Sequence, residues 1–388
     1  MSFPSTTIIT ARCPCRANDF SIAVPSSELP LAGSICHCDS CRHLTGCLFF
    51  AAAKWPYTLP QSPHLKSFSF SDSLNTYFCD ICGTQIFSER VKANSGQQTD
   101  ATETNIVYVK SGALEETEGV VKYETHLCIG DTTDGGVSDW ISEVPDTSMM
   151  KRWKGMTEQR EQVPVGWRAQ GHSTTTTEAN NSGHGADKIR GSCKCGGVSF
   201  HITRPDAKSA DWSLDLRQHK PEYEKPKEPW WLSGPDKDKY TTNCCCCASC
   251  RFASGVDFVS WTFVPSHNIR PAGDAEGQDW STSFGTLKTY ASSERSEWCF
   301  CSKCGAMCFL KLNGERPNVV DVASGLLWSE EGARAEDWLW WLTEKISFDE
   351  EGGKRPLVEA LRSGLKSWNE VHGNKMQFEE KAQHLGYK

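Results

Sequence analysis

A short cysteine frame that occurs twice constrains the fold of this chain more than any other feature. The first copy, "ICHCDSCRHLTG", spans Ile35–Gly46, and the second, "NCCCCASCRFASG", spans Asn243–Gly255. Both keep the pattern C-x-C-x-x-C-R-x-x-x-G, although Cys246 replaces His37 in the second copy. Cysteines spaced this closely are typical of metal sites, because their thiolates can converge in a tight turn with little strain.

The frame belongs to an ordered series of landmarks that recurs along the chain. In the first half the others are "ARCPCR" (Ala11–Arg16), "SDSLNTYFCDICGTQIF" (Ser71–Phe87) and "VYVKSGAL" (Val107–Leu114). In the second half they are "GSCKCGGVSF" (Gly191–Phe200), "SSERSEWCFCSKCGAMCF" (Ser292–Phe309) and "VDVASGLL" (Val320–Leu327). Recurrence of the whole series in the same order indicates an internal duplication.

The stretch between the two halves predicts a linker. "GWRAQGHSTTTTEANNSGHGADK" (Gly166–Lys188) is rich in Thr, Ser, Gly and Asn and has no apolar period. We therefore expect a first domain over residues 1–165, a flexible linker over 166–188 and a second domain over 189–388. The second domain has an insertion of its own near residues 206–239, where Trp230 and Trp231 are expected to pack against another part of the fold.

Composition and charge narrow the class of protein. The formal net charge of -8 argues against a general polyanion binder, so no nucleic-acid partner is expected. The N-terminal stretch lacks a signal-peptide pattern, and no apolar run is long enough for a membrane helix, which predicts a soluble, cytoplasmic protein. Because the cytosol keeps thiols reduced, the 20 cysteines favour metal binding over a disulfide scaffold.

Most secondary-structure signals indicate strands. "VSFHI" (Val198–Ile202), "FVSWTFV" (Phe258–Val264), "NIVYVKSG" (Asn105–Gly112) and "VVDVASG" (Val319–Gly325) are short, β-branched or aromatic, and end at turn residues. Helical spacing occurs at Arg334–Ile346, which could also be a strand, and at Pro356–Val371. The pattern predicts a mainly β fold with few short helices and a C-terminal helical tail.

Two sets of four cysteines are spaced for closed metal sites. In the first half a C-x-C pair and a C-x-x-C pair can complete one tetrahedron, and the second half repeats the arrangement. The two predicted sets are Cys13, Cys15, Cys79, Cys82 and Cys193, Cys195, Cys301, Cys304. Binding of a structural zinc ion contributes folding free energy of about 10 kcal/mol, which suits β domains with long loops.

The cysteines of the first frame predict a different kind of site. Cys36, Cys38 and Cys41 supply three ligands, which leaves a tetrahedral metal with one position for water or substrate. Alternation along the chain turns the side chain of His37 away from this trio, so we do not expect it to be a ligand. The alternative is a second closed site, with a fourth ligand from Cys47 in the first half and from Cys244 or Cys246 in the second.

The residues beside the frames allow more than one interpretation. Arg42 and Arg251 follow the third cysteine and could lower a thiolate pKa or hold a carboxylate-bearing ligand, or they could form surface ion pairs. Cys128 and Cys308 lie among apolar residues and are interpreted as small core side chains, and Cys299 should face away from its metal-binding neighbour.

The complete cysteine series resembles the glutathione-dependent formaldehyde-activating enzyme family, which also includes centromere protein V. The resemblance is carried by C-x-C, the frame, F-C-x-x-C-G and the "SG-L" strand of each half. It implies two tandem, zinc-organised β-tent domains and a structural zinc on each four-cysteine set. It also implies a second zinc on Cys36, Cys38 and Cys41 and, in the second half, on Cys245, Cys247 and Cys250, with Cys244, Cys247 and Cys250 as an alternative register.

The sequence departs from the family pattern at three places. Arg16 stands where the family prefers glycine, and the central histidine of the second frame is replaced. "YETHLCIG" (Tyr123–Gly130) is similar to a late histidine segment of the family, whereas the second half has "TEKISFDE", with Lys345 where His126 is expected to align. We therefore expect the second half to be the inactive one if one half has lost activity.

The resemblance implies carbon–sulfur chemistry on a thiol adduct of a small aldehyde, S-hydroxymethylglutathione-like, with a small-molecule thiol such as glutathione as partner. Predicted catalytic residues are Cys36, Cys38, Cys41 and Arg42, and predicted substrate-binding residues are Arg42, His126 and Arg251. A non-catalytic zinc scaffold that binds a protein partner is one alternative. Another is an enzyme for a different small electrophile, with Trp230 and Trp231 shaping its pocket. The oligomeric state stays open.

Overall fold

The computed structural model describes residues 5–91, 105–145, 149–157, 161–170, 187–220, 228–272 and 278–372. Within these ranges the chain is mainly β, with three α-helices and several short 3-10 turns. Most of the predicted linker, residues 171–186, lies outside the described part, so the domain boundaries stay a prediction. Among the described helices, none has the length and apolar character needed to cross a bilayer.

The first half contains a two-stranded ribbon and a large sheet. The ribbon pairs β1 (Thr6–Arg12) with β2 (Asp19–Pro25). The sheet has the strand order β10-β9-β3-β4-β8-β7-β6-β5. Its strands are β3 (Leu31–Cys36), β4 (Phe50–Lys54), β5 (Leu65–Ser71), β6 (Leu74–Cys79), β7 (Gln85–Arg90), β8 (Ile106–Lys110), β9 (Val121–Leu127) and β10 (Lys151–Arg152).

The second half repeats this plan with two sheets. A four-stranded sheet has the order β16-β12-β11-β21, and a larger one has the order β13-β14-β15-β20-β19-β18-β17 with β22 also paired to β14. The smaller sheet comprises β11 (Lys188–Ser192), β12 (Ser199–Thr203), β16 (Ile269–Pro271) and β21 (Leu327–Trp328). The larger comprises β13 (Leu232–Ser233), β14 (Lys239–Cys245), β15 (Val259–Pro265), β17 (Leu287–Ala291), β18 (Ser296–Cys301), β19 (Met307–Leu312), β20 (Val319–Ala323) and β22 (Leu339–Ser347).

The strand that leads into each frame has the same neighbours in both halves. β3 pairs antiparallel with β4 and parallel with β9, and β14 pairs antiparallel with β15 and parallel with β22. Each then leads to a short helix, α1 (Asp39–Thr45) or α2 (Ala248–Ser254). The 3-10 turns η3 (Ile129–Thr132) and η11 (Asp349–Gly352) follow β9 and β22. This shared topology confirms that the segments are repeated.

The four predicted strands are confirmed by β8, β12, β15 and β20. Of the two alternatives for Arg334–Ile346, the structure has the strand, β22 (Leu339–Ser347), and the helix predicted at Pro356–Val371 is confirmed by α3 (Pro356–His372). Trp230 and Trp231 of the insertion are fully buried, and the Trp230 ring lies 4.9 Å from that of Phe263, centroid to centroid.

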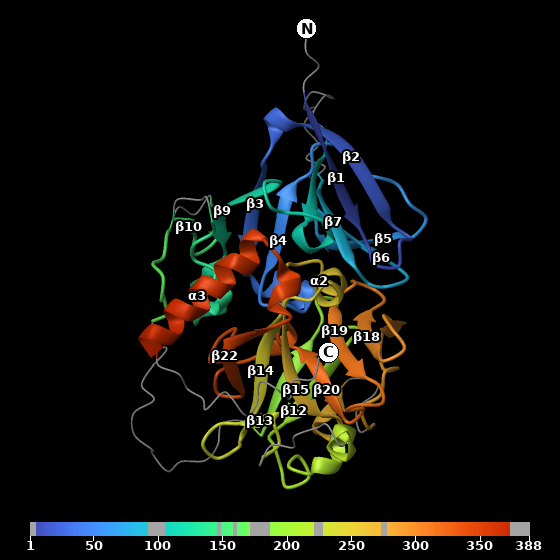
Figure 1. The fold of residues 1–388 in the computed structure, drawn as a ribbon, viewed down its shortest axis with the longest axis vertical. Coiled ribbons are helices and arrows are strands. Elements are labelled where there is room, and N and C mark those ends of the chain that lie inside the picture. The colour runs from blue at the N-terminus through green and yellow to red at the C-terminus, as the bar shows by residue number, and fades with distance from the viewer. Residues whose placement is uncertain are drawn as a thin grey trace.

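The two halves lie against each other (Figure 1). Buried apolar side chains of both form one continuous core. The frame glycines Gly46 and Gly255 end α1 and α2 with φ of 78° and 76°. They fit against the opposite half so closely that an added Cβ would lie 2.1 Å from the Met307 carbonyl oxygen or 2.4 Å from that of Gln85. The rings of the equivalent residues Phe49 and Phe258 meet at 4.8 Å across the interface.

Backbone hydrogen bonds cross the interface in both directions and join equivalent residues of the two halves. The N–H of Gly325, in η10 (Ser324–Leu326), donates to the Gly46 carbonyl at 3.0 Å. The N–H of Gly112, in η2 (Ser111–Ala113), donates to the Gly255 carbonyl at 2.9 Å. Helix α3 also crosses to the first half, where an added Cβ on Gly364 would lie 1.9 Å from the Trp140 carbonyl oxygen. The last residue of each frame is therefore an interface residue.

Candidate metal centres

Both predicted four-cysteine sets come together in the structure. The sulfurs of Cys13, Cys15, Cys79 and Cys82 lie within 4.8 Å of one another, as do those of Cys193, Cys195, Cys301 and Cys304. In each set the C-x-C pair follows the first strand of its half, and the C-x-x-C pair follows a strand of the large sheet. Each cluster thus joins the two sheets of its half and could hold a metal ion.

Backbone conformation explains the residues that surround these clusters. Gly83 and Gly305 follow the C-x-x-C pairs with φ of 80° and 74°, and their N–H groups donate to the carbonyls of Cys79 and Cys301. The position after C-x-C is also left-handed, with φ of 73° at Gly196 and 60° at Arg16. Glycine adopts this conformation without strain, which is why Arg16 is an unusual choice there.

Each frame brings its three cysteines together at the start of a helix. The trios are Cys36, Cys38, Cys41 and Cys245, Cys247, Cys250, and within each trio the sulfurs lie within 4.8 Å of one another. The middle cysteine is the N-cap residue, so the Cys41 and Cys250 N–H groups donate to the sulfurs of Cys38 and Cys247 at 3.3 Å. In the second trio, hydrogen bonds from Cys245 and Cys250 lower the pKa of Cys247 to about 4.

The residues considered as alternative ligands of the two trios lie outside both clusters. The second trio has the register that the resemblance implies, because Cys244 and Cys246 lie outside the cluster. Cys47 is buried near Ser254 of the opposite half, and burial raises its pKa to about 12. His37 turns away from the first trio, and its Nε2 lies 2.8 Å from Nδ1 of His126.

The predicted substrate-binding residues have internal partners. The Arg42 side chain is buried and donates to the Asp39 carboxylate. Arg251 donates to the carbonyls of Gly112 and Leu114 in the first half, each at 2.7 Å, so it connects the two halves. Burial lowers its pKa to about 9. Their roles in substrate binding stay predictions.

His126 is fully buried behind the first trio, and desolvation lowers its pKa well below the usual value. The strand register corrects the residue that was expected to match His126 in the second half. β9 pairs His126 with Ile35, and β22 pairs Ile346 with Cys244, so Ile346 rather than Lys345 occupies the matching position. The second half thus has Cys246 and Ile346 where the first half has the buried pair His37 and His126.

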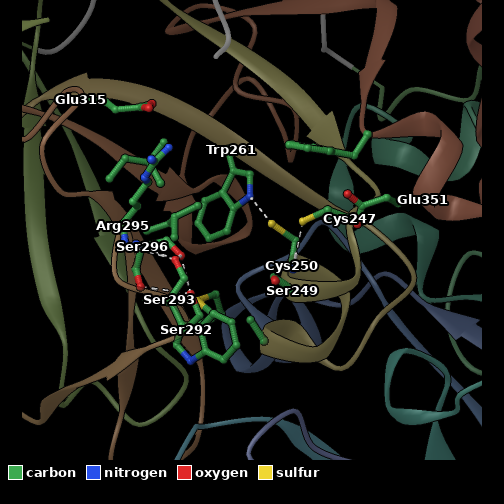
Figure 2. A pocket seen from close by; sticks show the side chains of 16 residues that line it. Cys247, Ser249, Cys250, Trp261, Ser292, Ser293, Arg295, Ser296, Glu315 and Glu351 are labelled. Carbon is green, nitrogen blue, oxygen red and sulfur yellow. Dashed lines mark hydrogen bonds between the residues drawn. The ribbon is translucent and has the colours of Figure 1, made fainter. Parts of the chain in front are cut away.

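A cavity of about 340 Å³ opens beside the second trio. Cys247 and Cys250 lie on one side of it, with the rings of Trp261 and Phe348 forming part of the wall. Figure 2 shows Ser292, Ser293, Ser296 and Arg295 across the cavity from these cysteines. The serines come from the β17–β18 turn, where the Ser292 and Ser296 hydroxyls are 2.6 Å apart. The cavity therefore has a thiolate side and a polar side, and Arg295 and Glu315 are both among its lining residues. Trp230 and Trp231 are not among its lining residues.

Two residues that the sequence did not single out contact the second site. The Trp261 indole Nε1–H donates to the Cys250 sulfur at 3.3 Å, an interaction that orients this sulfur and would withdraw charge from it if it held a metal ion. Glu351 lines the cavity near Cys247, and its Oε2 accepts a hydrogen bond from the Ala248 N–H at 3.1 Å (Figure 2). Only strand pairing and the β22–η11 turn reveal these neighbours.

The first trio has different surroundings. By strand register Ala52 occupies the place of Trp261, since Ala52 pairs with Ser34 and Trp261 with Asn243. Lys110 is fully buried close to the trio, and desolvation lowers its pKa to about 7 while the Cys41 charge raises it. Its ammonium donates to the Gln85 side chain.

Comparison with known protein families supports both the internal duplication and the family resemblance. The family model described as "Glutathione-dependent formaldehyde-activating enzyme" matches residues 8–129 and 234–343, which together make up more than half of the chain. The second match begins at residue 234, near the end of the insertion, so the Cys193–Cys195 pair lies outside it. A search of curated proteins returned no match to this sequence.

Proposed function

This chain belongs to the glutathione-dependent formaldehyde-activating enzyme family, and from that membership we propose that it is a zinc-dependent enzyme acting on adducts of a thiol with a small aldehyde. The reaction is the formation or cleavage of a thiohemiacetal such as S-hydroxymethylglutathione, which is carbon–sulfur lyase chemistry. We assign it to the second trio.

The observation that carries this assignment is the cavity beside Cys247 and Cys250. Three sulfurs in one cluster suit zinc, which favours thiolate ligands in tetrahedral geometry. Three protein ligands leave one coordination position for a substrate, and the cavity gives a small molecule access to that side of the trio. Zinc supplies the chemistry of lowering the pKa of a bound thiol, so that the thiolate predominates near neutral pH.

The reaction moves one proton from the thiol to the aldehyde oxygen. In the forward direction the thiolate sulfur forms a bond to the aldehyde carbon, the C=O π bond breaks, and the oxygen takes up the proton that the thiol lost. Glu351 lies at the cavity, and its hydrogen bond to the Ala248 N–H fixes its position. We assign to Glu351 the role of accepting this proton from the thiol and returning it to the oxygen.

The polar side of the cavity suits a thiol with carboxylate groups. Arg295 is exposed at the cavity, and within the described residues its guanidinium has no carboxylate partner. The hydroxyls of Ser292, Ser293 and Ser296 surround it with further hydrogen-bonding groups. Glutathione carries two carboxylates on an extended peptide, so Arg295 can bind one of them while the sulfur reaches the trio.

A matched pair of serine variants tests the assignment. Cys38 and Cys247 are the N-cap residues of α1 and α2, and serine keeps that capping role while removing a thiolate ligand. We expect Cys247→Ser to slow exchange of ¹³C-formaldehyde into its glutathione adduct, followed by NMR, by at least about 100-fold. Cys38→Ser should retain turnover, with near-UV circular dichroism reporting the fold.

The competing sequence-based assignment places catalysis at Cys36, Cys38, Cys41 and Arg42. It requires the reverse result, in which Cys38→Ser abolishes turnover and Cys247→Ser does not. Wild-type turnover in both variants would refute the enzymatic proposal and favour a zinc scaffold.

A further inference from the structure

A fourth cysteine lies beside the first trio. Cys128 directly follows β9, and β9 runs parallel to β3 with Leu127 opposite Cys36. The register therefore brings Cys128 to the end of the strand where the frame begins, although 87 positions separate it from Cys41 in the sequence. Its left-handed backbone, with φ of 56°, reverses the chain into η3.

The Cys128 side chain faces the trio. The Cys128 thiol lies close enough to those of Cys36 and Cys38 for each to shift the pKa of the others, and its sulfur lies 3.5 Å from that of Met156. It is outside the group of three sulfurs that lie within 4.8 Å of one another, so a rotation about χ1 is needed to complete a tetrahedron. Cys128 is half-buried, not a core side chain as the sequence suggested.

The second half has a different residue at this position. β22 pairs Ser347 with Cys245, so Phe348 is the counterpart of Cys128. Phe348 has the same backbone conformation, with φ of 54°, and its ring lines the cavity. A thiol therefore faces one trio, and an apolar wall faces the other.

The charged groups around the two trios also differ, in a way that favours four thiolates at the first trio and three at the second. Zinc with four thiolates carries one more negative charge than zinc with three, and burial makes an uncompensated charge costly. Buried Lys110 lies close enough to Cys41 to interact with its charge. Its counterpart is Ala323, since Lys110 pairs with Ala52 and Ala323 with Trp261. Among the described residues, only the first trio thus has a buried lysine side chain near it, and this lysine also interacts with the charge of Cys304.

We propose that Cys128 closes the first trio as a fourth thiolate ligand, so that the first half holds two closed zinc sites and the second half holds one closed and one open. This reverses the expectation that the second half is the inactive one. The ligand assignment stands on the first-half contacts alone, whereas the open second site rests on the proposed function.

Zinc retention tests the ligand assignment without measuring turnover. After zinc loading, a mild competing chelator should quickly remove one zinc ion from the wild-type chain, because open sites exchange faster than closed ones. Cys128→Ser should release a second ion. Phe348→Cys, the matched variant, places a thiol beside the second trio and should release none. Equal release by Cys128→Ser and the wild type would refute the proposal.

Alkylation of the unmutated chain gives an independent measurement, in case Cys128→Ser folds poorly. With zinc bound, Cys128 should resist iodoacetamide, and its modification, followed by peptide mass spectrometry, should accelerate at least about tenfold once zinc is removed. The same rate with and without zinc would overturn the proposal. Absence of turnover, by contrast, would remove the proposed function but leave both zinc measurements interpretable.

Discussion

Replacing Gly46 by alanine should destabilise the chain by disturbing two features at once. Gly46 has φ of 78°, a conformation that costs an alanine about 1 kcal/mol. The new Cβ would also lie 2.1 Å from the Met307 carbonyl oxygen and 3.1 Å from the Ala323 Cβ. These atoms belong to strands β19 and β20, so relief requires the two halves to separate slightly. Overpacking of this kind costs about 1–3 kcal/mol, which gives a total of about 2–4 kcal/mol.

Gly119 provides the matched control. It has φ of 67°, and no atom lies within 4 Å of where its Cβ would be. Gly119→Ala should therefore lose only the conformational part, about 1 kcal/mol. The assay is urea unfolding with zinc present, in which the midpoint should fall further for Gly46→Ala at unchanged slope. Equal losses in the two variants would show that the halves do not pack against each other through the frame glycine.

Three further predictions concern the cavity and the interface. Arg295→Ala should raise KM for glutathione about tenfold, the value of one charge-assisted contact, with little effect on a neutral thiol such as 2-mercaptoethanol; equal effects on both thiols would exclude a carboxylate-binding role. Trp261→Phe removes the N–H donor to Cys250 and should weaken zinc binding at the second trio about 10–100-fold, measured by chelator competition, whereas unchanged affinity would mean that the bond does not support the ligand. Burial lowers the pKa of His43 to about 3, and its Nδ1 lies 2.7 Å from the Ser192 carbonyl oxygen of the other half; because the unfolded histidine titrates near 6.5, its contribution is present above that pH and should fall by about 2 kcal/mol between pH 7 and pH 5. His43→Asn should make this pH dependence of urea unfolding shallower, and an unchanged slope would contradict the reasoning.

Sequence spacing predicts the metal clusters well because their ligands are arranged by local turns. C-x-C and C-x-x-C pairs bring sulfurs together over two or three residues, and the frame itself contains the N-cap turn that orients Cys38 and Cys247. In the structure the second trio has the register Cys245, Cys247, Cys250, which the family resemblance implied. The convergence of these pairs could therefore be inferred from spacing alone, whereas spacing allowed either Cys244 or Cys245 as the first member of the second trio.

Residues brought in by strand pairing could not be inferred in this way. Cys128 and Phe348 reach the trios only because β9 and β22 run parallel to β3 and β14, and nothing local indicates that pairing. The helical spacing of the β22 segment, which also allowed a strand, has a similar origin. Its buried residues include Leu339 and Leu342, three apart as on a helix, because a register shift interrupts the pairing with β14.

The interface between the halves has the form of an isologous contact between two copies of one domain, since each frame glycine meets the equivalent strand and turn of the other half. In a dimer of identical chains, every substitution appears in both copies, and a change that closes one site closes the other. Joining the copies in a single polypeptide removes that constraint. Cys128 and Phe348 can then differ while the contact surface is retained. One chain can thus combine a closed site that retains its metal ion with an open site that binds and releases a substrate.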